Sequence, residues 1–370
     1  MKVDQIKLNA ENYYNSTKFE TIKYGIGINV NLNKLNIDKL KFNNSKNKID
    51  IIANKSVKII DFSKLKTEIN YINKLIKEDE NKIISLHFSR FNSEKLIIIP
   101  KDTIITEPII INSDSQDETD LYNIIIIAEE SSKANIIEIS KSNNKTKLKS
   151  NIIQIFANKN SNIKYNYINL NDKKTNCFNI KRSEIKKDAN IDFLDVNLGS
   201  NFNQNSNKTY LKESGANTNN YAIYFTNEKQ NYDIDIENIH DGSNTNSNII
   251  SKAILDDESK IIYRSNINVN KNCKRCNGHQ KENTLLISKD SKIDAVPMLE
   301  INNEDVNISH GVTISDIEEE KLYYLKSRGL DEEQSKEIII RGFINELIDK
   351  IEDKNILQLV EKEINKKLKK

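Results

Sequence analysis

A short sequence pattern recurs along the middle of the chain and limits the folds that it can adopt. A small residue, then Asn or Lys, then usually Ile follows a polar turn at six places, which begin at Ala134, Ser161, Ala189, Ala216, Ser259 and Ser291. The first three spacings are 27, 28 and 27 residues, and the later ones are longer. A period in the twenties, built from strands and tight turns, is typical of stacked β coils that bury apolar residues against one another. The pattern favours a β-solenoid.

Short apolar or alternating runs lie among these turns. They begin at Ile124, Asn135, Ser150, Ile163, Ile191, Ala222 and Ile261. No helix-period pattern separates them, so they are not βαβ units. Because Asn tolerates the left-handed conformation and bonds its own backbone, we expect Asn at the corners of the coils. A β-sandwich with Greek-key connections stays open as the alternative, since its turn signals come every ~8–12 residues.

Composition supports strands and excludes several classes of protein. The chain has 370 residues, including 62 Ile and 56 Asn. Ile packs well on pleated surfaces, and disordered chains lack such residues. Lys and Arg total 56 and Asp and Glu 54, a formal charge of +2 that offers no basic field for nucleic acid. No apolar run approaches the roughly 18 residues of a membrane span, so we expect neither nucleic acid nor a membrane as partner.

The distribution of Asn marks a boundary near residue 312. Asn is frequent through Asn307 and then occurs at three positions, while Glu, Lys and Leu rise. We therefore predict an N-terminal mixed α/β segment over residues 1–110, a β-solenoid core over 111–311 and a C-terminal helical domain over 312–370.

Local patterns predict elements at both ends of the chain. Residues 21–36 read as a strand pair, and residues 62–79 as an amphipathic helix. Three helices are expected after the core. Ser315 or Asp316 is the expected N-cap of the first, which ends before Gly329. Asp331 starts the second, and the third runs from about Asn355.

Cys273, Cys276 and His279 form the densest cluster of metal-capable residues. Thiolates and imidazole suit zinc or the iron of a cluster, and the neighbouring Lys274 and Arg275 would favour thiolate. The alternative is two reduced surface thiols. Three Cys do not make a disulfide framework, and the N-terminus lacks the apolar stretch of a secretory signal, so we expect a cytoplasmic location. No phosphate loop, nucleophile elbow or HExxH pattern indicates an enzyme.

Several short and unusual sequence motifs follow one another at fixed spacing between residues 283 and 351. They are Leu285-Leu286, Pro297 to Ile301, Asp305-Val306, Ser309-His310-Gly311, Tyr324 to Leu330 and Arg341-Gly342-Phe343. In these motifs the chain resembles the SufB/SufD family of iron–sulfur cluster assembly proteins. The resemblance implies a right-handed parallel β-helix flanked by helical segments, which agrees with the coil pattern.

The resemblance also implies a non-enzymatic role and two partners. Family members form a scaffold complex of a SufB-like subunit, a SufD-like subunit and a SufC-like ABC ATPase. The β-helices of SufB and SufD pair with one another, and His310 maps onto a His at that interface that is implicated in cluster formation. The C-terminal helices dock the ATPase; the matching residues are Tyr324, Leu325, Arg328, Gly329, Arg341 and Phe343. In isolation such a chain can form a homodimer.

Two departures from the SufB pattern favour a SufD-like member. SufB-like members carry Glu where this chain has Gly311, and a functional Cys where it has Glu282. Ile308 occupies a position that is Cys in some SufD proteins. We expect Glu282 and His310 at the cluster-assembly interface.

We expect the complex to bind iron or a nascent cluster transiently. We expect no stably bound cofactor on this chain, because stable clusters usually take four Cys ligands. We hypothesise that Cys273, Cys276 and His279 assist His310 in holding it. Two other functions stay open: a β-helix polysaccharide-active enzyme, and a purely structural interaction module of the same fold.

Overall fold

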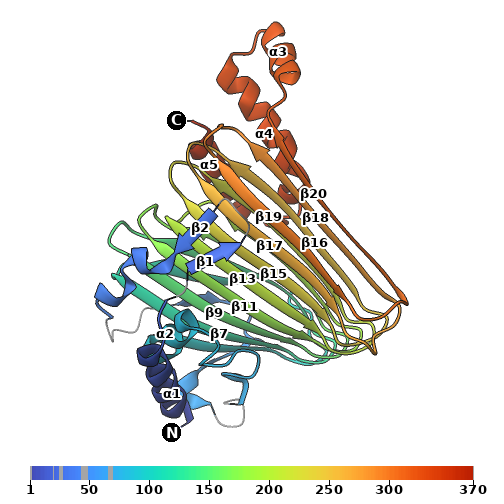
Figure 1. The fold of residues 1–370 in the computed structure, drawn as a ribbon. Helices are drawn as coiled ribbons and strands as arrows, with labels where there is room; N and C mark the ends of the chain where they lie inside the picture. The colour runs from blue at the N-terminus through green and yellow to red at the C-terminus, as the bar shows by residue number, and fades with distance from the viewer. Residues whose placement is uncertain (1, 20, 25–27, 43–48, 66–69, 370) are drawn as a thin grey trace.

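Two sheets of parallel strands wind together along the molecule in the computed structural model, which describes residues 2–19, 21–24, 28–42, 49–65 and 70–369 (Figure 1). We call them the odd sheet and the even sheet after their strand numbers. The odd sheet contains β5 (Ser93–Ile99), β7 (Thr119–Ala128), β9 (Leu148–Ala157), β11 (Asn176–Ile185), β13 (Phe202–Leu211), β15 (Asn231–His240), β17 (Lys260–Val269) and β19 (Lys292–Ile301). The even sheet contains β6 (Ile109–Ser115), β8 (Lys133–Ser142), β10 (Asn162–Leu170), β12 (Asn190–Asn197), β14 (Asn217–Thr226), β16 (Asn246–Leu255), β18 (Cys276–Leu286) and β20 (Val306–Asp316).

Each coil therefore contributes one strand to each sheet, and the predicted parallel β-solenoid is confirmed. The β-sandwich alternative is wrong, because neighbouring strands from β5 to β20 pair in parallel. Two short strands, β3 (Asp50–Ile52) and β4 (Lys58–Asp61), add to the first coil in the antiparallel direction. The division into three domains at residues 110 and 311 stays a prediction; parallel pairing itself runs from Ser93 to Asp316.

The sequence repeat is real, but its register differs from the expected one. Ser161, Ala189 and Ala216 do precede the aligned strands β10, β12 and β14. Ala134 lies two residues out of step, because it pairs with Ile163. The repeats at Ser259 and Ser291 precede β17 and β19, which belong to the other sheet. The repeated sequence motif thus marks the starts of strands in both sheets.

Asn is mostly found along the strands, where it forms ladders, and less at the corners. One register position of the even sheet is Asn on six successive strands: Asn162, Asn190, Asn217, Asn246, Asn277 and Asn307. The Asn246 amide donates to Asn217 at 2.7 Å, and that of Asn277 donates to Asn246 at 2.9 Å. Among the described corner residues with positive φ, Asp, Ser, Glu and Arg outnumber Asn. The expectation of Asn at the corners is therefore only partly correct.

The interior of the solenoid contains charged groups as well as apolar ones. Lys181 and Asp195 form a buried ion pair, and Asn205 Nδ2 donates to the same carboxylate at 2.8 Å. Glu138 accepts hydrogen bonds from two buried Tyr hydroxyls, and burial raises its pKa. Such groups are tolerated because their partners come from adjacent strands fixed in register.

Helical segments cover the outer faces of both sheets. The N-terminal segment packs its apolar side chains on the odd sheet, and α4 (Glu332–Ile348) and α5 (Lys354–Leu368) pack theirs on the even sheet. α3 (Glu319–Ser327) instead stands beyond the solenoid (Figure 1). None of its residues is buried.

The N-terminal predictions are partly correct. β1 (Thr21–Tyr24) and β2 (Ile28–Asn31) form the predicted strand pair, which is antiparallel. β2 contacts β17 and β19, and Ile28 N donates to Asp294 Oδ2 at 2.9 Å. The helix predicted over 62–79 is wrong where the structure describes it, since that stretch holds a 3₁₀ turn (Phe62–Lys64) and further turns; its residues 66–69 lie outside the described part. α1 (Lys2–Ser16) and α2 (Lys82–Arg90) were not predicted.

The three C-terminal helices are confirmed with one corrected boundary. β20 continues through Ser315 and Asp316, so neither is an N-cap; Glu318 precedes α3. Gly329 follows α3 at φ 91°, as expected for a residue that ends a helix. Asp331 caps α4 with a capping box.

The buried ion pair generates a stability prediction. Lys181→Met would leave the Asp195 carboxylate buried without its counter-charge, which we expect to cost about 3–5 kcal/mol. The double variant Lys181→Met/Asp195→Leu should regain most of that loss. The measurement is the midpoint of urea unfolding. Lys229→Met is the control, because Lys229 pairs with Glu258 at the surface, and its effect should stay within about 0.5 kcal/mol. Equal losses in Lys181→Met and Lys229→Met would contradict the prediction.

Candidate functional site

The last coil, formed by β19 and β20, leaves one end of the solenoid uncovered. These are the final strands of their sheets, so their outer backbone edges face no further strand of the part that the structure describes. The side chains in register with interior residues of the coil below, such as Ile261, Tyr263 and Cys276, face the solenoid axis. Most are apolar, and together we call them the apolar end face: Ile293, Ala295, Pro297, Leu299, Ile301, Val306, Ile308, Val312 and Ile314. All are exposed or half-exposed, with Ile314 at 47%.

Gly278 shows that β20 turns these residues inward. A Cβ built on Gly278 would come within 2.9 Å of both Ile267 and Ile308, which therefore fill the space above it. Ile308 is in register with Gly278 and packs on the apolar interior of the last coils. The apolar end face is thus a continuation of the core that stops where the coils stop.

His310 lies in the middle of the apolar end face. Its register partner on β18 is Gln280, which is buried, accepts from Ser265 Oγ at 2.5 Å and donates to Met298 O at 2.8 Å. His310 itself is exposed. A Cβ at the following Gly311 would meet no atom within 4 Å, so the strand is also open on that side. The imidazole is therefore accessible at the open end of the solenoid.

Glu282 lies one coil deeper, in register with Val312. Its side chain is buried, with 2% exposed. Thr284 Oγ1 donates to Oε1 at 2.5 Å, whereas Oε2 has no hydrogen-bond partner among the described residues. Burial raises the pKa of Glu282 to about 7. Glu282 and His310 are therefore diagonal neighbours on adjacent strands, and the deeper one is a carboxyl with a free acceptor.

Cys273 and Cys276 lie in the apolar interior of the last coils, so their interpretation as surface thiols is wrong. Thr245 Oγ1 donates to Cys276 Sγ at 3.3 Å. Burial raises the pKa of Cys273, which acts against the thiolate form of that residue expected beside Lys274 and Arg275.

His279 does not join the two Cys. It follows Cys276 by three residues on β18 and so points to the opposite face of the strand, where its Nδ1 lies 2.9 Å from Ser309 Oγ. The same alternation separates His279 from His310 on the neighbouring strand. Within the described residues no group of three His, Cys, Asp or Glu could hold a metal ion. The hypothesis that Cys273, Cys276 and His279 assist His310 finds no support in this geometry.

The other two His are structural. His87 lies within 2.7 Å of Ser150 Oγ, and burial lowers its pKa to about 3. His240 contacts the hydroxyls of Thr245 and Ser247, and burial lowers its pKa to about 4. Exposure thus distinguishes His279 and His310, both on the last two even strands, as the His available to a ligand.

α3 presents a second exposed surface. Tyr323 is 78% exposed and Tyr324 57% exposed, and the Arg328 guanidinium lies 5.2 Å from the centre of the Tyr324 ring. Leu325 is half-buried, and Gly329 ends the helix. We call Tyr323, Tyr324 and Arg328 the α3 surface. Tyr323 is an addition to the sequence-based set.

Arg341 and Phe343 have contacts within the chain. Arg341 Nε lies 2.8 Å from Glu337 Oε1, and its guanidinium also bonds Asn365 of α5. Phe343 is half-buried beside Lys252, whose Nζ donates to the Phe343 carbonyl at 2.7 Å. The structure gives these two residues a part in fixing α4 to α5 and to β16.

Comparison with known proteins agrees with this architecture. The model of the SUF system FeS cluster assembly SufBD core domain matches residues 109–343, which cover most of the solenoid, α3 and the first part of α4. This chain belongs to the SufB/SufD family. The match includes both the apolar end face and the α3 surface.

Named relatives come from staphylococci. Iron–sulfur cluster assembly SufBD family proteins of Staphylococcus saprophyticus and Staphylococcus epidermidis are 28% identical to the chain over 282 residues, and one from Staphylococcus aureus is 27% identical. These alignments cover 74% of the chain and 60% of each relative. The chain thus spans about 60% of the length of the curated relatives it matches. Among the described helices of this family member, none has the length and apolar character to cross a membrane.

Glu282 generates a pH prediction. Its folded pKa of about 7 lies above the ordinary 4.5, so its stabilising contribution is complete below pH 4.5 and is lost as the pH rises through 7. Relative to Glu282→Gln, the wild-type chain should therefore lose about 3 kcal/mol of unfolding free energy between pH 4.5 and pH 8. Chemical unfolding across this range measures it. The exposed Glu258→Gln is the matched control; if Glu282→Gln and Glu258→Gln show the same pH profile, Glu282 is not the group responsible.

Proposed function

We propose that this chain is a SufD-like, non-enzymatic scaffold subunit that pairs with a SufB-like subunit through the apolar end face. The main observation in support is that this face continues the core of the solenoid and is left exposed by the last coil, with His310 at its centre. Family membership supplies the context of iron–sulfur cluster assembly. Gly311 and Glu282, at positions where SufB-like members carry Glu and Cys, support the SufD-like role.

Pairing follows from the energetics of an uncovered coil. The unpaired edges of β19 and β20 offer backbone hydrogen bonds, and half-exposed side chains such as Ile301 and Ile314 gain about 25 cal/mol for each Å² that a partner covers. A second solenoid that presents a similar end would satisfy both. Two copies of this chain can use the same face when no SufB-like subunit is present.

Iron or a nascent cluster is the cargo of the paired interface. His310 supplies one imidazole ligand there, and Glu282, one coil deeper, supplies a carboxyl that can accept a proton or a bond from iron-bound groups. The remaining ligands come from the partner, since a stable cluster usually takes four thiolates and both Cys of this region are packed in the core. A preparation of this chain alone should be colourless.

The α3 surface is the proposed docking site for the SufC-like ATPase. α3 has no buried residue and exposes two adjacent Tyr rings, whose apolar surface would be removed from water by a bound partner. Tyr and Arg are also enriched at protein interfaces. In this role Tyr324, Leu325, Arg328 and Gly329 shape the docking helix. Arg341 and Phe343 act indirectly by holding α4 on the solenoid.

Pairing can be tested with a charge placed on the apolar end face. Ile314→Arg should weaken the complex with the SufB-like subunit at least tenfold, because a charged group would be buried in the interface. Size-exclusion chromatography and titration of the purified subunits measure it. Ile104→Arg is the matched control, since Ile104 is 65% exposed near the other end of the solenoid and its change should leave pairing intact.

The role of His310 is tested in the same assembled complex. His310→Ala should keep the pairing and lose most of the iron and sulfide bound after anaerobic reconstitution with all partners. Unchanged iron and sulfide would favour the purely structural module. Failure of the chain to pair with any SufB-like subunit would leave the polysaccharide-active enzyme as the alternative, to be assayed on acidic polysaccharides.

ATPase docking has its own test. Tyr323→Ala/Tyr324→Ala should reduce binding of the SufC-like ATPase at least tenfold while helix content and thermal unfolding stay unchanged, because neither ring is buried. Ile338→Ala is the control, as this exposed residue lies on α4 outside the α3 surface. Undiminished ATPase binding by the double Tyr variant would sink the docking proposal.

A further inference from the structure

The border of the apolar end face is acidic. The last coil and the corner that leads into it, residues 287–316, contain six acidic and two basic residues. Their formal charge is −4, whereas the chain as a whole carries +2. All eight residues are exposed or half-exposed. The acidic ones are Asp290, Asp294, Glu300, Glu304, Asp305 and Asp316, which we call the acidic border, and the basic ones are Lys289 and Lys292.

The acidic border lies on both strands of the last coil and at their corners. Asp294 and Glu300 alternate along β19 with side chains of the apolar end face. Glu304 and Asp305 lie in the corner between β19 and β20, and Asp316 ends β20. A partner that covers the apolar end face therefore comes close to carboxylates on more than one side.

The ion pairs of the chain leave the charge of the acidic border uncompensated. None of the ion pairs between described residues involves one of its six carboxylates. Glu300 accepts hydrogen bonds from the side-chain amides of Asn266 at 3.2 Å and Asn268 at 2.8 Å. Asp294 accepts one from the backbone of Ile28 at 2.9 Å. These donors are neutral, so they hold the carboxylates in place and do not cancel their charge.

Basic residues lie one coil below the acidic border. The corner between β17 and β18 contains Lys271, Lys274 and Arg275, and Arg275 N donates to Asp305 O at 2.6 Å. The corner that carries Glu304 and Asp305 thus lies between these basic residues and anything that covers the end. Because salt screens exposed charges over about 8 Å, the outermost layer of charge dominates the potential that a partner meets.

We propose that the acidic border makes this end of the solenoid selective for a partner whose own apolar face is bordered by Lys and Arg. The inference rests on the proposed pairing and adds the chemistry of the partner's surface. Opposite charges around an interface speed association and reject wrong partners, whereas like charges that face each other cost affinity. Two copies of this chain would bring two acidic borders together. The border therefore favours a SufB-like subunit over a second copy, although the apolar end face suits both.

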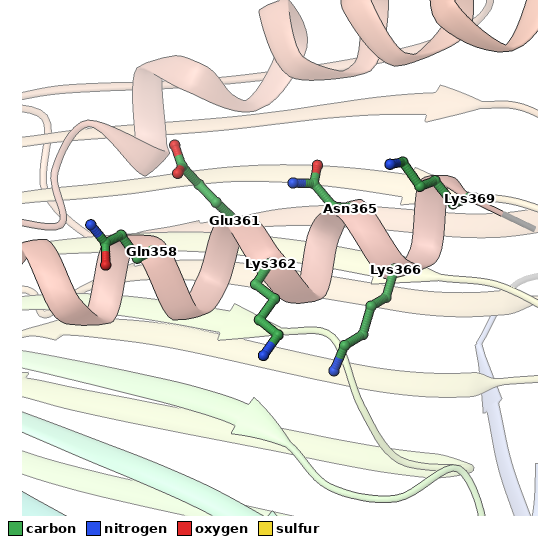
Figure 2. Close-up of a pocket in the computed structure, with 6 residues that line it drawn as sticks. All are labelled: Gln358, Glu361, Lys362, Asn365, Lys366 and Lys369. Carbon is green, nitrogen blue, oxygen red and sulfur yellow. The ribbon is translucent and has the colours of Figure 1, made fainter.

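The basic side of α5 does not supply such a surface from a second copy. Figure 2 shows the polar side chains that line a surface hollow on this helix: Gln358, Glu361, Lys362, Asn365, Lys366 and Lys369. The apolar side of α5 is packed on the even sheet. A copy that offered α5 would match the charge of the acidic border and leave the apolar end face without an apolar partner. The complementary surface is therefore expected on a different chain.

Salt distinguishes pairing with the SufB-like subunit from self-pairing. Sedimentation velocity of the full chain, alone and with the purified SufB-like subunit, is measured from about 50 to about 500 mM NaCl, over which the screening length falls roughly threefold. We expect the heteropair to weaken at least about tenfold over this range, and any self-association of the chain to strengthen. A heteropair of constant affinity, or self-association that weakens with salt, overturns the proposal. If the chain alone stays monomeric throughout, the heteropair decides.

Neutral variants of similar shape test the charges themselves. Glu300→Gln/Glu304→Gln/Asp305→Asn removes three charges of the acidic border, and Glu300→Gln keeps an acceptor for the neighbouring amides. At about 50 mM NaCl this triple variant should bind the SufB-like subunit at least about fivefold more weakly than the wild-type chain, and with a smaller salt dependence. Glu107→Gln/Asp114→Asn is the control. Both residues are exposed on the first coil, so pairing should stay unchanged.

The pairing proposal and the charge inference fail in different ways. If the triple variant pairs as the wild-type chain does while Ile314→Arg disrupts pairing, the apolar end face is the interface and the acidic border does not select the partner. If the chain and the SufB-like subunit do not pair at any salt concentration, the proposed function and this inference both fail.

Discussion

In-register stacking of parallel coils is the constraint on which the rest of this structure depends. Because each strand bonds to the strands above and below at fixed register, side chains alternate strictly between the axis and the outer face. This alternation brings Lys181 to Asp195 inside the solenoid and aligns six Asn on one sheet. It also decides which of the chemically active residues can meet.

The same constraint explains why the candidate site lies at the last coil. Each earlier coil of the described solenoid has another coil stacked on it, whereas the interior row of the last coil is exposed or half-exposed, and His310 is part of that row. Glu282 belongs to the same row one layer down, where coverage already makes it a buried acid. The candidate site is therefore a cross-section of the core, and α3 follows it directly in the chain. The surfaces proposed for pairing and for ATPase docking are thus close in sequence but distinct from one another.

The sequence predicted this architecture well where apolar residues carry the signal. The runs at Ile124, Ile163 and Ile261 all lie within strands. Strands such as β13, with the polar sequence FNQNSNKTYL, gave no such signal, because their stability comes from amide ladders and buried polar bonds between coils. The boundary at Ser315 was misplaced because pairing with β18 extends β20, which outweighs a local capping preference.

The candidate site residues were named from family motifs, and their grouping in space was not predictable from the sequence. Cys276 and His279 have a spacing that suits a metal ligand pair in a turn or a helix. On a strand the same spacing places them on opposite faces, and no feature of the local sequence says which applies. The exposure of Tyr323 and the burial of Cys273 likewise depend on neighbours distant in the chain.

The strand pair near the N-terminus has a consequence for how the solenoid holds together. Stacked repeats ordinarily fray from their ends, because an end coil has one neighbour instead of two. Here β2 contacts β17 and β19, and Ile28 is bonded to Asp294 of the last coil. An early part of the chain thus contacts the outer side of the last coils, and this contact links the N-terminal segment to the coil that carries His310. Loss of the contact between β2 and the last coils would make the exposed end of the solenoid the first part of the molecule to unfold.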